Sequence, residues 1–287
     1  MSWKIYLLSL PFVLASCDLV NPEEPEPAYL EINEFVFSTD VATQGSSSSK
    51  ITEVWLFVDG EYKGAYDLPA FIPVLKEGPA KIRLEAGIKE NGRRLTPDIY
   101  PFYSPFTIDV TLEANKTETI TPVTTYLPEA KFSFIEDYED NRIRIFTDNI
   151  TGNQSIIRTQ DDAFEGQYSG QFYLTKDSVR VVEFSTSTSF NSLMDNGVYV
   201  YLEINYKSDV PVAWGVVGQV DIITGLERSL EVGFSANEEW NKIYLNISKS
   251  IVDSQLDDYK IAFQAFLLEE SPDSANVLID NIKLVHF

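Results

Sequence analysis

The side chains that most often act as nucleophiles or general bases are nearly absent from this sequence. One histidine, His286, and one cysteine, Cys17, occur among its 287 residues. A histidine base needs a nucleophile or an orienting acid beside it, and the sequence contains neither a Gly-x-Ser-x-Gly turn nor a glycine-rich phosphate loop. Paired carboxylates that cleave glycosides remain an alternative among 44 acidic residues, but no pair stands out. We therefore expect a protein that is not an enzyme.

Tyrosines in two alternating segments indicate a ligand site instead. In segments 171–175 and 198–206, successive side chains point to opposite sides of a strand, so that apolar residues share one face and tyrosines the other. Sugar binding requires aromatic rings that stack on a pyranose, flanked by groups that bond its hydroxyls. The alternative is an ordinary sheet surface on which neighbouring tyrosines stabilise each other. The alternation predicts a glycan-binding groove of Tyr173, Tyr199, Tyr201 and Glu203, which Gln264 of the predicted strand 260–268 joins if its side chain faces outward.

Short alternating strands bounded by turn residues must position these side chains. Residues 29–126 contain strands such as 53–58, which is followed by a hairpin turn at Asp59-Gly60. Residues 127–287 contain eight or more strands, and 251–256 is the only segment with the character of a short helix. The pattern predicts an all-β chain of two β-sandwich domains, the second a jelly roll of antiparallel strands.

One segment of the first domain, Asn91 to Pro105, differs from the strands around it. It combines three prolines with three aromatic residues, Tyr100, Phe102 and Tyr103. Two interpretations remain open at this point. The segment is either a loop tucked against the edge of the sandwich or a loop that docks on a partner.

The first seventeen residues have the pattern of an export signal. Lys4 precedes an apolar run that is too short to span a bilayer, which requires about 20 apolar residues. Small residues follow just before Cys17, as they do at signal cleavage sites. The tetrapeptide Leu14-Ala15-Ser16-Cys17 resembles the lipobox of bacterial lipoproteins. The resemblance implies a signal peptide at 1–16 and acyl chains such as palmitate on Cys17; the alternative is an ordinary secretory signal followed by a stray cysteine.

The charge of the chain limits its partners. It carries 44 acidic and 22 basic residues, a formal net charge of −22, which repels nucleic acids and anionic headgroups. We expect no nucleic-acid partner, and contact with a membrane only through the lipid on Cys17, with the proline- and glutamate-rich segment 17–28 as a tether. The early acidic residues resemble surface-export signals of Bacteroidetes lipoproteins. That resemblance implies a lipid-anchored protein of the outer membrane and favours exposure on the cell surface over a periplasmic orientation.

The first domain contains a run of residues with a family resemblance. The run comprises Trp55-Leu56-Phe57-Val58-Asp59-Gly60, then Leu68-Pro69, then Leu75-Lys76-Glu77-Gly78. It is similar to PEGA-type surface-layer domains, although Pro79 stands where that family has a histidine. The resemblance implies a structural or binding role without catalysis.

The second domain carries another resemblance. Its pieces are Glu136-Asp137-Tyr138-Glu139, Gly166-Gln167-Tyr168-Ser169-Gly170, Gly197-Val198-Tyr199 and Ile279-Asp280-Asn281-Ile282. In this order they resemble the galactose-binding-like jelly rolls, which include many carbohydrate-binding modules. The resemblance implies a structural calcium ion, for which oxygen ligands are required, held by Glu139, Gln167 and Asp280, with Asp137 as an alternative. A solvated acidic rim without metal is the other interpretation.

Taken together, the residues favour a non-catalytic lipoprotein of the cell envelope. Its expected role is glycan binding or adhesion through the C-terminal jelly roll, with no required cofactor. The alternative is a structural or accessory subunit of an outer-membrane protein complex, docked on a protein partner.

Overall fold

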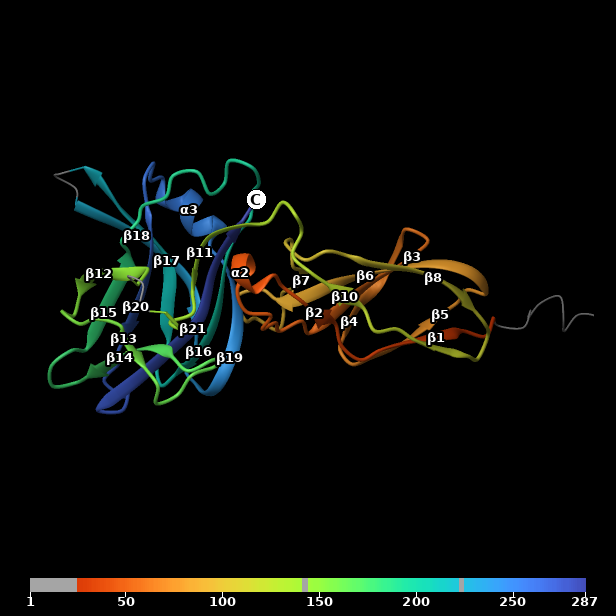
Figure 1. Cartoon of the computed structure of the whole chain (residues 1–287), viewed down its shortest axis with the longest axis horizontal. Helices are drawn as coiled ribbons and strands as arrows, with labels where there is room; N and C mark the ends of the chain where they lie inside the picture. Colours follow the sequence, from red (N-terminus) through yellow and green to blue (C-terminus); the bar gives the residue numbers. More distant parts are fainter. Residues whose placement is uncertain (1–24, 141–143, 222–224) are drawn as a thin grey trace, which may run out of the picture.

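The computed structural model describes residues 25–140, 144–221 and 225–287, which form two β-rich units placed end to end (Figure 1). The predicted signal peptide, Cys17 and most of the predicted tether lie outside the described residues. Within the described part of the chain, no helix is both long and apolar enough to cross a bilayer.

The first unit is a small sandwich of short strands. A sheet β4-β3-β6 is extended by β7 and β8, which pair with different parts of β6; β5-β1-β9 form a second sheet, and β2 pairs with β10. The apolar faces of these strands enclose one core. The elements are β1 (Ala28–Ile32), β2 (Val36–Phe37), α2 (Val41–Gln44), β3 (Glu53–Val58), β4 (Glu61–Asp67), β5 (Ala70–Val74), β6 (Gly78–Lys89), β7 (Pro97–Ile99), β8 (Phe106–Leu112), β9 (Thr117–Thr119) and β10 (Val123–Thr124).

The hairpin of β3 and β4 shows how the local sequence specifies these strands. Val54, Leu56 and Val58 alternate along β3 and are all buried in the core of the first unit, as a period of two requires. At the turn, Asp59 has φ 51° and Gly60 has φ 87°. A two-residue hairpin loop of type I′ needs positive φ at both positions, which Asp-Gly accommodates at low cost.

The second unit is a two-sheet sandwich, which confirms the predicted all-β fold and its jelly-roll second unit. One sheet, called here the junction sheet, has the order β13-β14-β21-β16-β19, with β11 paired to β21; the other, the open sheet, has the order β12-β15-β20-β17-β18. The elements are β11 (Lys131–Glu136), β12 (Phe146–Thr151), β13 (Ile157–Thr159), β14 (Ser169–Thr175), β15 (Val181–Thr186), β16 (Val200–Ser208), β17 (Val212–Asp221), β18 (Gly225–Phe234), β19 (Asn237–Asn246), α3 (Ser248–Ser254), β20 (Lys260–Phe266) and β21 (Ser274–His286).

The outward face of the junction sheet packs against the first unit. Tyr201, Tyr244 and Val285 of this sheet belong to the same buried cluster as the core of the first unit. Segment 91–105 reaches them: the ring of Tyr100 lies 5.3 Å from that of Tyr201 and 4.8 Å from that of Tyr244. Figure 1 shows β7 at this end of the first unit, next to the second. The aromatic segment is therefore a docking loop whose partner is the second unit of the same chain.

One acidic and two basic side chains lie buried in the middle of this interface. Glu203 is 0% exposed, and its Oε2 lies 2.8 Å from Nζ of Lys242. Its Oε1 accepts hydrogen bonds from the hydroxyls of Tyr100, at 2.9 Å, and Tyr126, at 2.6 Å. Lys283 donates to the Tyr126 hydroxyl at 3.2 Å and to a backbone carbonyl of the first unit at 2.6 Å. Buried charges require such partners.

The groups of this cluster set one another's protonation. Burial alone would raise the pKa of Glu203, but the charges of Lys242 and Lys283 outweigh it and hold the pKa below its ordinary value. Burial lowers the pKa of Lys283 to about 8. Burial and the Glu203 charge raise the pKa values of Tyr100 and Tyr126 well above their ordinary value, so both hydroxyls stay protonated and donate.

We predict that Glu203→Gln lowers the free energy of unfolding by about 3–5 kcal/mol, because two lysines would stay buried without their counter-charge. Urea denaturation followed by circular dichroism measures the change. The control is Glu238→Gln, an exposed position on β19, for which we expect a change below about 0.5 kcal/mol. Equally small effects of the two substitutions would show that the buried cluster does not stabilise the protein.

Candidate functional site

The five residues of the predicted groove do not form one surface. Tyr201 and Glu203 are 1% and 0% exposed, because the first unit covers the face on which they lie. Tyr173 and Tyr199, 42% and 40% exposed, lie on or beside the same sheet, and Gln264 lies on β20 of the opposite sheet. The alternation along β16 was predicted correctly, but the outward face serves to bind the first unit. The predicted groove is thus corrected: two of its residues are inaccessible and a third belongs elsewhere.

A loop of the second unit covers another part of the junction sheet. The indole of Trp240 donates to Oδ1 of Asp162 at 2.7 Å, and Lys207 donates to Oδ2 of the same carboxylate at 2.9 Å. The ring of Phe164 lies 5.9 Å from that of Trp240. These contacts hold the loop before β14 on β16 and β19. Little of this face is left for a ligand.

The open sheet carries a hollow on its outward face. A cavity of about 730 Å³ lies across β12, β15, β17, β18 and β20. Ser185 and Gly218 form parts of its wall where large side chains would close it, and a Cβ on Gly218 would come within 2.6 Å of a backbone oxygen. This volume is in the range of small-molecule sites in proteins. The groove lies on the face that the first unit does not cover.

The groove presents hydrogen-bond donors, acceptors and apolar surface together. Lys260 pairs with the carboxylate of Asp148 at one wall, and Asp258 adds an exposed carboxylate. Apolar surface comes from Val217 and from Leu226, which is 46% exposed. Sugars offer hydroxyls that both donate and accept, and ring faces that are apolar. The groove matches both properties.

A second polar cluster continues along the same sheet. Glu183 of β15 is 1% exposed and accepts from Nε of Arg228 at 2.8 Å and from the amide of Gln264 at 3.3 Å. Gln264 shares a strand face with Lys260, four residues away on β20. Of the five predicted residues, Gln264 is thus the one on the sheet that bears the groove.

The three residues of the predicted calcium site meet at one loop. Oε1 of Glu139 accepts from the backbone N–H groups of Gln167 and Tyr168, both at 2.8 Å. Oδ2 of Asp280 accepts from the N–H groups of Phe164 and Glu165, at 3.2 and 3.3 Å. The residues are therefore near each other, as the resemblance implied. Their oxygens, however, face N–H donors.

These contacts do not fit a calcium ion, which takes six to eight oxygen ligands. Gln167 contributes an N–H group to Glu139, and Asp137 accepts from the N–H of Glu139 at 3.1 Å. The nearby carbonyls of Tyr138 and Glu139 accept from the Arg158 guanidinium, at 2.5 and 2.6 Å. Across the described ranges, no group of three or more His, Cys, Asp and Glu residues is arranged to hold a metal. We derive no role for calcium from this geometry.

The carboxyl group of Asp280 has a strongly shifted pKa. Burial raises it to about 8, and the negative charge of Glu139 adds to the shift, although three backbone hydrogen bonds oppose it. The ordinary value is 3.8. Between these pH values the folded state holds one proton more than the unfolded state, so Asp280 makes the free energy of unfolding fall as the pH rises.

We predict that Asp280→Asn removes this loss of stability, which amounts to at most about 1.4 kcal/mol per pH unit between pH 4 and 8. Urea denaturation at pH 5 and pH 8 gives the difference between variant and wild type. Other titrating groups cancel in that difference. Asp273→Asn is the control, since its side chain is fully exposed. Parallel pH profiles of Asp280→Asn and wild type would contradict the raised pKa.

Comparisons with known proteins assign no family. No protein-family model matches the chain, and no curated protein matches its sequence. One solved structure, from a study of the promiscuous specificity of carbohydrate-binding modules of the β-sandwich superfamily, is 14% identical over 81% of this chain and 84% of that chain, with a TM-score of 0.38. The family 22 module at the C-terminus of Clostridium thermocellum Xyn10B is 12% identical over 54% and 92%, with a TM-score of 0.36.

The family 11 module of the Clostridium thermocellum cellulase Lic26A-Cel5E gives similar values. It is 12% identical over 54% of this chain and 95% of that chain, with a TM-score of 0.35. TM-scores below 0.5 are too low to support an argument on this chain.

The walls of the groove were not predicted from the sequence. Asp148, Ser185 and Lys260 lie on three strands that are far apart in the chain and neighbours in the sheet. The alternation of β20 places Lys260 and Gln264 on one face, so the strand face itself was predictable. The order β12-β15-β20-β17 was not, since it results from long-range pairing.

Proposed function

We propose that this chain is a non-catalytic glycan-binding protein of the cell envelope and that the groove of its open sheet holds the glycan. One observation carries the proposal: a hollow of about 730 Å³ with mixed polar and apolar walls lies on the sheet face that the first unit leaves free. Parts of the other sheet face are covered by the first unit and by the loop before β14. The proposed ligand site therefore lies on the open sheet, whereas the sequence suggested a site on the junction sheet.

The polar groups of the groove suit hydroxyl recognition. Lys260 is a donor whose charge strengthens each hydrogen bond it makes, while Asp148 and Asp258 are acceptors. A sugar hydroxyl that bridges the two side chains would accept a hydrogen bond from Lys260 and donate one to Asp148. The exposed Leu226 and the buried Val217 beneath would contact the apolar ring face.

We predict that Lys260→Ala weakens glycan binding by about tenfold or more, since a hydrogen bond to a charged group contributes about 1.5–3 kcal/mol. A glycan array identifies the ligand, and isothermal titration calorimetry gives the affinities. Tyr199→Ala is the matched control, because Tyr199 is exposed beside the opposite sheet. Loss of binding with Tyr199→Ala but not with Lys260→Ala would place the site elsewhere, and binding of no glycan would refute the proposal.

Lipid anchoring through Cys17 is part of the same proposal, and the position of the first unit is compatible with it. Figure 1 shows β1, the first strand, at the end of the first unit that is remote from the second unit. A lipid attached before β1 would hold the second unit, with its groove, away from the membrane. This arrangement suits a protein of the outer membrane that meets ligands at the cell surface.

We predict that the protein isolated from its native host begins at Cys17 and carries acyl chains, as measured by mass spectrometry of the intact chain. A Cys17→Ser variant should move from the detergent phase to the aqueous phase of a Triton X-114 partition, because the lipid supplies the membrane affinity. An unacylated chain that still begins at Met1 would contradict this part of the proposal.

The alternative role is a subunit docked on a membrane protein through its sandwich faces and the aromatic loop, and the loop gives it no support. Tyr100 and Phe102 of that loop are both 0% exposed at the interface between the two units. A partner would have to displace the second unit to reach them. The loop is therefore not available as a free docking surface.

A further inference from the structure

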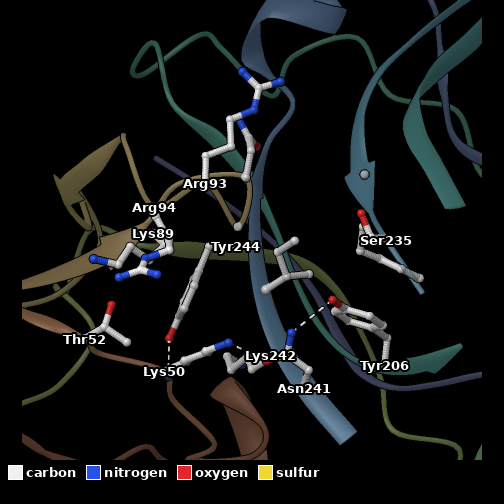
Figure 2. A pocket seen from close by; sticks show the side chains of 15 residues that line it. Lys50, Thr52, Lys89, Arg93, Arg94, Tyr206, Ser235, Asn241, Lys242 and Tyr244 are labelled. Carbon is white, nitrogen blue, oxygen red and sulfur yellow. Dashed lines mark hydrogen bonds between the residues drawn. The ribbon is translucent and has the colours of Figure 1, made fainter. Parts of the chain in front are cut away.

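A separate hollow of about 530 Å³ lies where the two units meet. Its walls come from the turn after β6, from the end of β18 and from β19, which is an edge strand of the junction sheet. Figure 2 shows the rings of Tyr206 and Tyr244 on opposite sides of β19 within this hollow. The backbone of Asn91 donates to the carbonyl of Tyr244 at 2.9 Å, so the turn of the first unit is bonded directly to β19. We call this hollow the junction pocket.

The charge of the junction pocket is opposite to that of the chain. Fifteen residues line it, and none of these fifteen is an aspartate or a glutamate. The whole chain has twice as many acidic as basic residues. Five basic residues are thus gathered in this pocket. They are Lys50, Lys89, Arg93, Arg94 and Lys242.

Two of the five basic side chains are paired with carboxylates that do not line the pocket. Lys89 pairs with Glu53 and, at 3.1 Å, with Asp67, and Lys242 pairs with Glu203 at 2.8 Å. The remaining three have no carboxylate partner among the residues that the structure describes. These are Lys50, Arg93 and Arg94.

The surroundings of the three remaining cations favour an anionic ligand. Lys50 donates from Nζ to Oδ1 of Asn241, a neutral group, and partial burial lowers the pKa of Lys50. Arg93 and Arg94 are exposed at the rim. Guanidinium groups bind carboxylate, sulfate and phosphate oxygens with paired hydrogen bonds.

We propose that the junction pocket binds an acidic saccharide through the carboxylate or sulfate groups of the sugar. The hydroxyls of Thr52 and Ser235 line the same pocket and can bond sugar hydroxyls. A long polyanion or a lipid surface would also meet the acidic exterior of a chain with a net charge of −22, which repels it. A short acidic oligosaccharide fits within the basic pocket and avoids that repulsion.

This inference goes beyond the proposed function and does not depend on it. The groove on the open sheet and the junction pocket share no lining residue. Lys260→Ala should therefore leave binding at the junction pocket unchanged. Failure of one site in experiment does not decide the other.

Titration calorimetry of the full chain as its Cys17→Ser variant tests the inference. The probes are a uronic acid oligosaccharide, a sulfated oligosaccharide, a neutral oligosaccharide of the same length, sodium sulfate alone and vesicles that contain phosphatidylglycerol. We expect one of the two acidic oligosaccharides to bind, and its affinity to fall by tenfold or more in the double variant Arg93→Gln/Arg94→Gln. Raising the salt concentration from 50 to 500 mM should weaken binding as well.

The control is Arg180→Gln, since Arg180 is an exposed arginine of the second unit that pairs with Glu269; it should leave the affinity unchanged. Thermal unfolding verifies that each variant is folded. Equal binding of neutral and acidic oligosaccharides by the Lys260→Ala variant, in which the groove on the open sheet is disabled, or unchanged binding by the double arginine variant, would overturn the inference. Sodium sulfate that binds as tightly as the saccharides would overturn the saccharide assignment, and binding only to vesicles would replace it with a lipid headgroup.

Discussion

The carboxylate of Glu203, buried between two lysines and two tyrosine hydroxyls, is the contact on which the rest of this structure depends. It lies on the second unit, and the hydroxyls that donate to it, those of Tyr100 and Tyr126, come from the first. A buried charge is costly unless it is paired and hydrogen-bonded. Separation of the two units would remove both donors and leave the charged groups of the sheet only partly satisfied. The units are therefore held in one arrangement, and the positions of both hollows follow from it.

Aromatic rings and charges have different roles in this interface. The rings of Tyr100, Phe102 and Tyr201 remove a large apolar area from water, which is the main source of favourable free energy in such contacts. A buried ion pair adds little net stability compared with apolar packing, because desolvation offsets the attraction. Glu203 and Lys242 instead make every other relative position of the two units unfavourable in free energy. In a shifted interface these charges would be buried without partners. The apolar surface makes the contact strong, and the charges make it specific.

Much of the fold could be predicted from the sequence, but less of the candidate sites could be, and particular residues show why. Alternation placed Tyr201 and Glu203 on the outward face of β16, and the Asp59-Gly60 pair placed a hairpin turn. Both are local properties, which a period of two or a positive φ determines. What covers the outward face of β16 is not local, because it depends on segment 91–105, about a hundred residues earlier in the chain. An exposed tyrosine and a tyrosine at an interface between units have the same sequence pattern.

Covering the junction sheet also has a consequence for ligands. A sheet edge such as β19 carries unpaired backbone groups that invite pairing with another chain. Here the turn after β6 occupies part of that edge, through the bond from Asn91 to Tyr244, and brings Arg93 and Arg94 beside β19. The same contact that protects the edge thus builds a basic pocket in an acidic molecule. Because the chain as a whole is strongly acidic, the pocket favours anions small enough to lie within it over long polyanions.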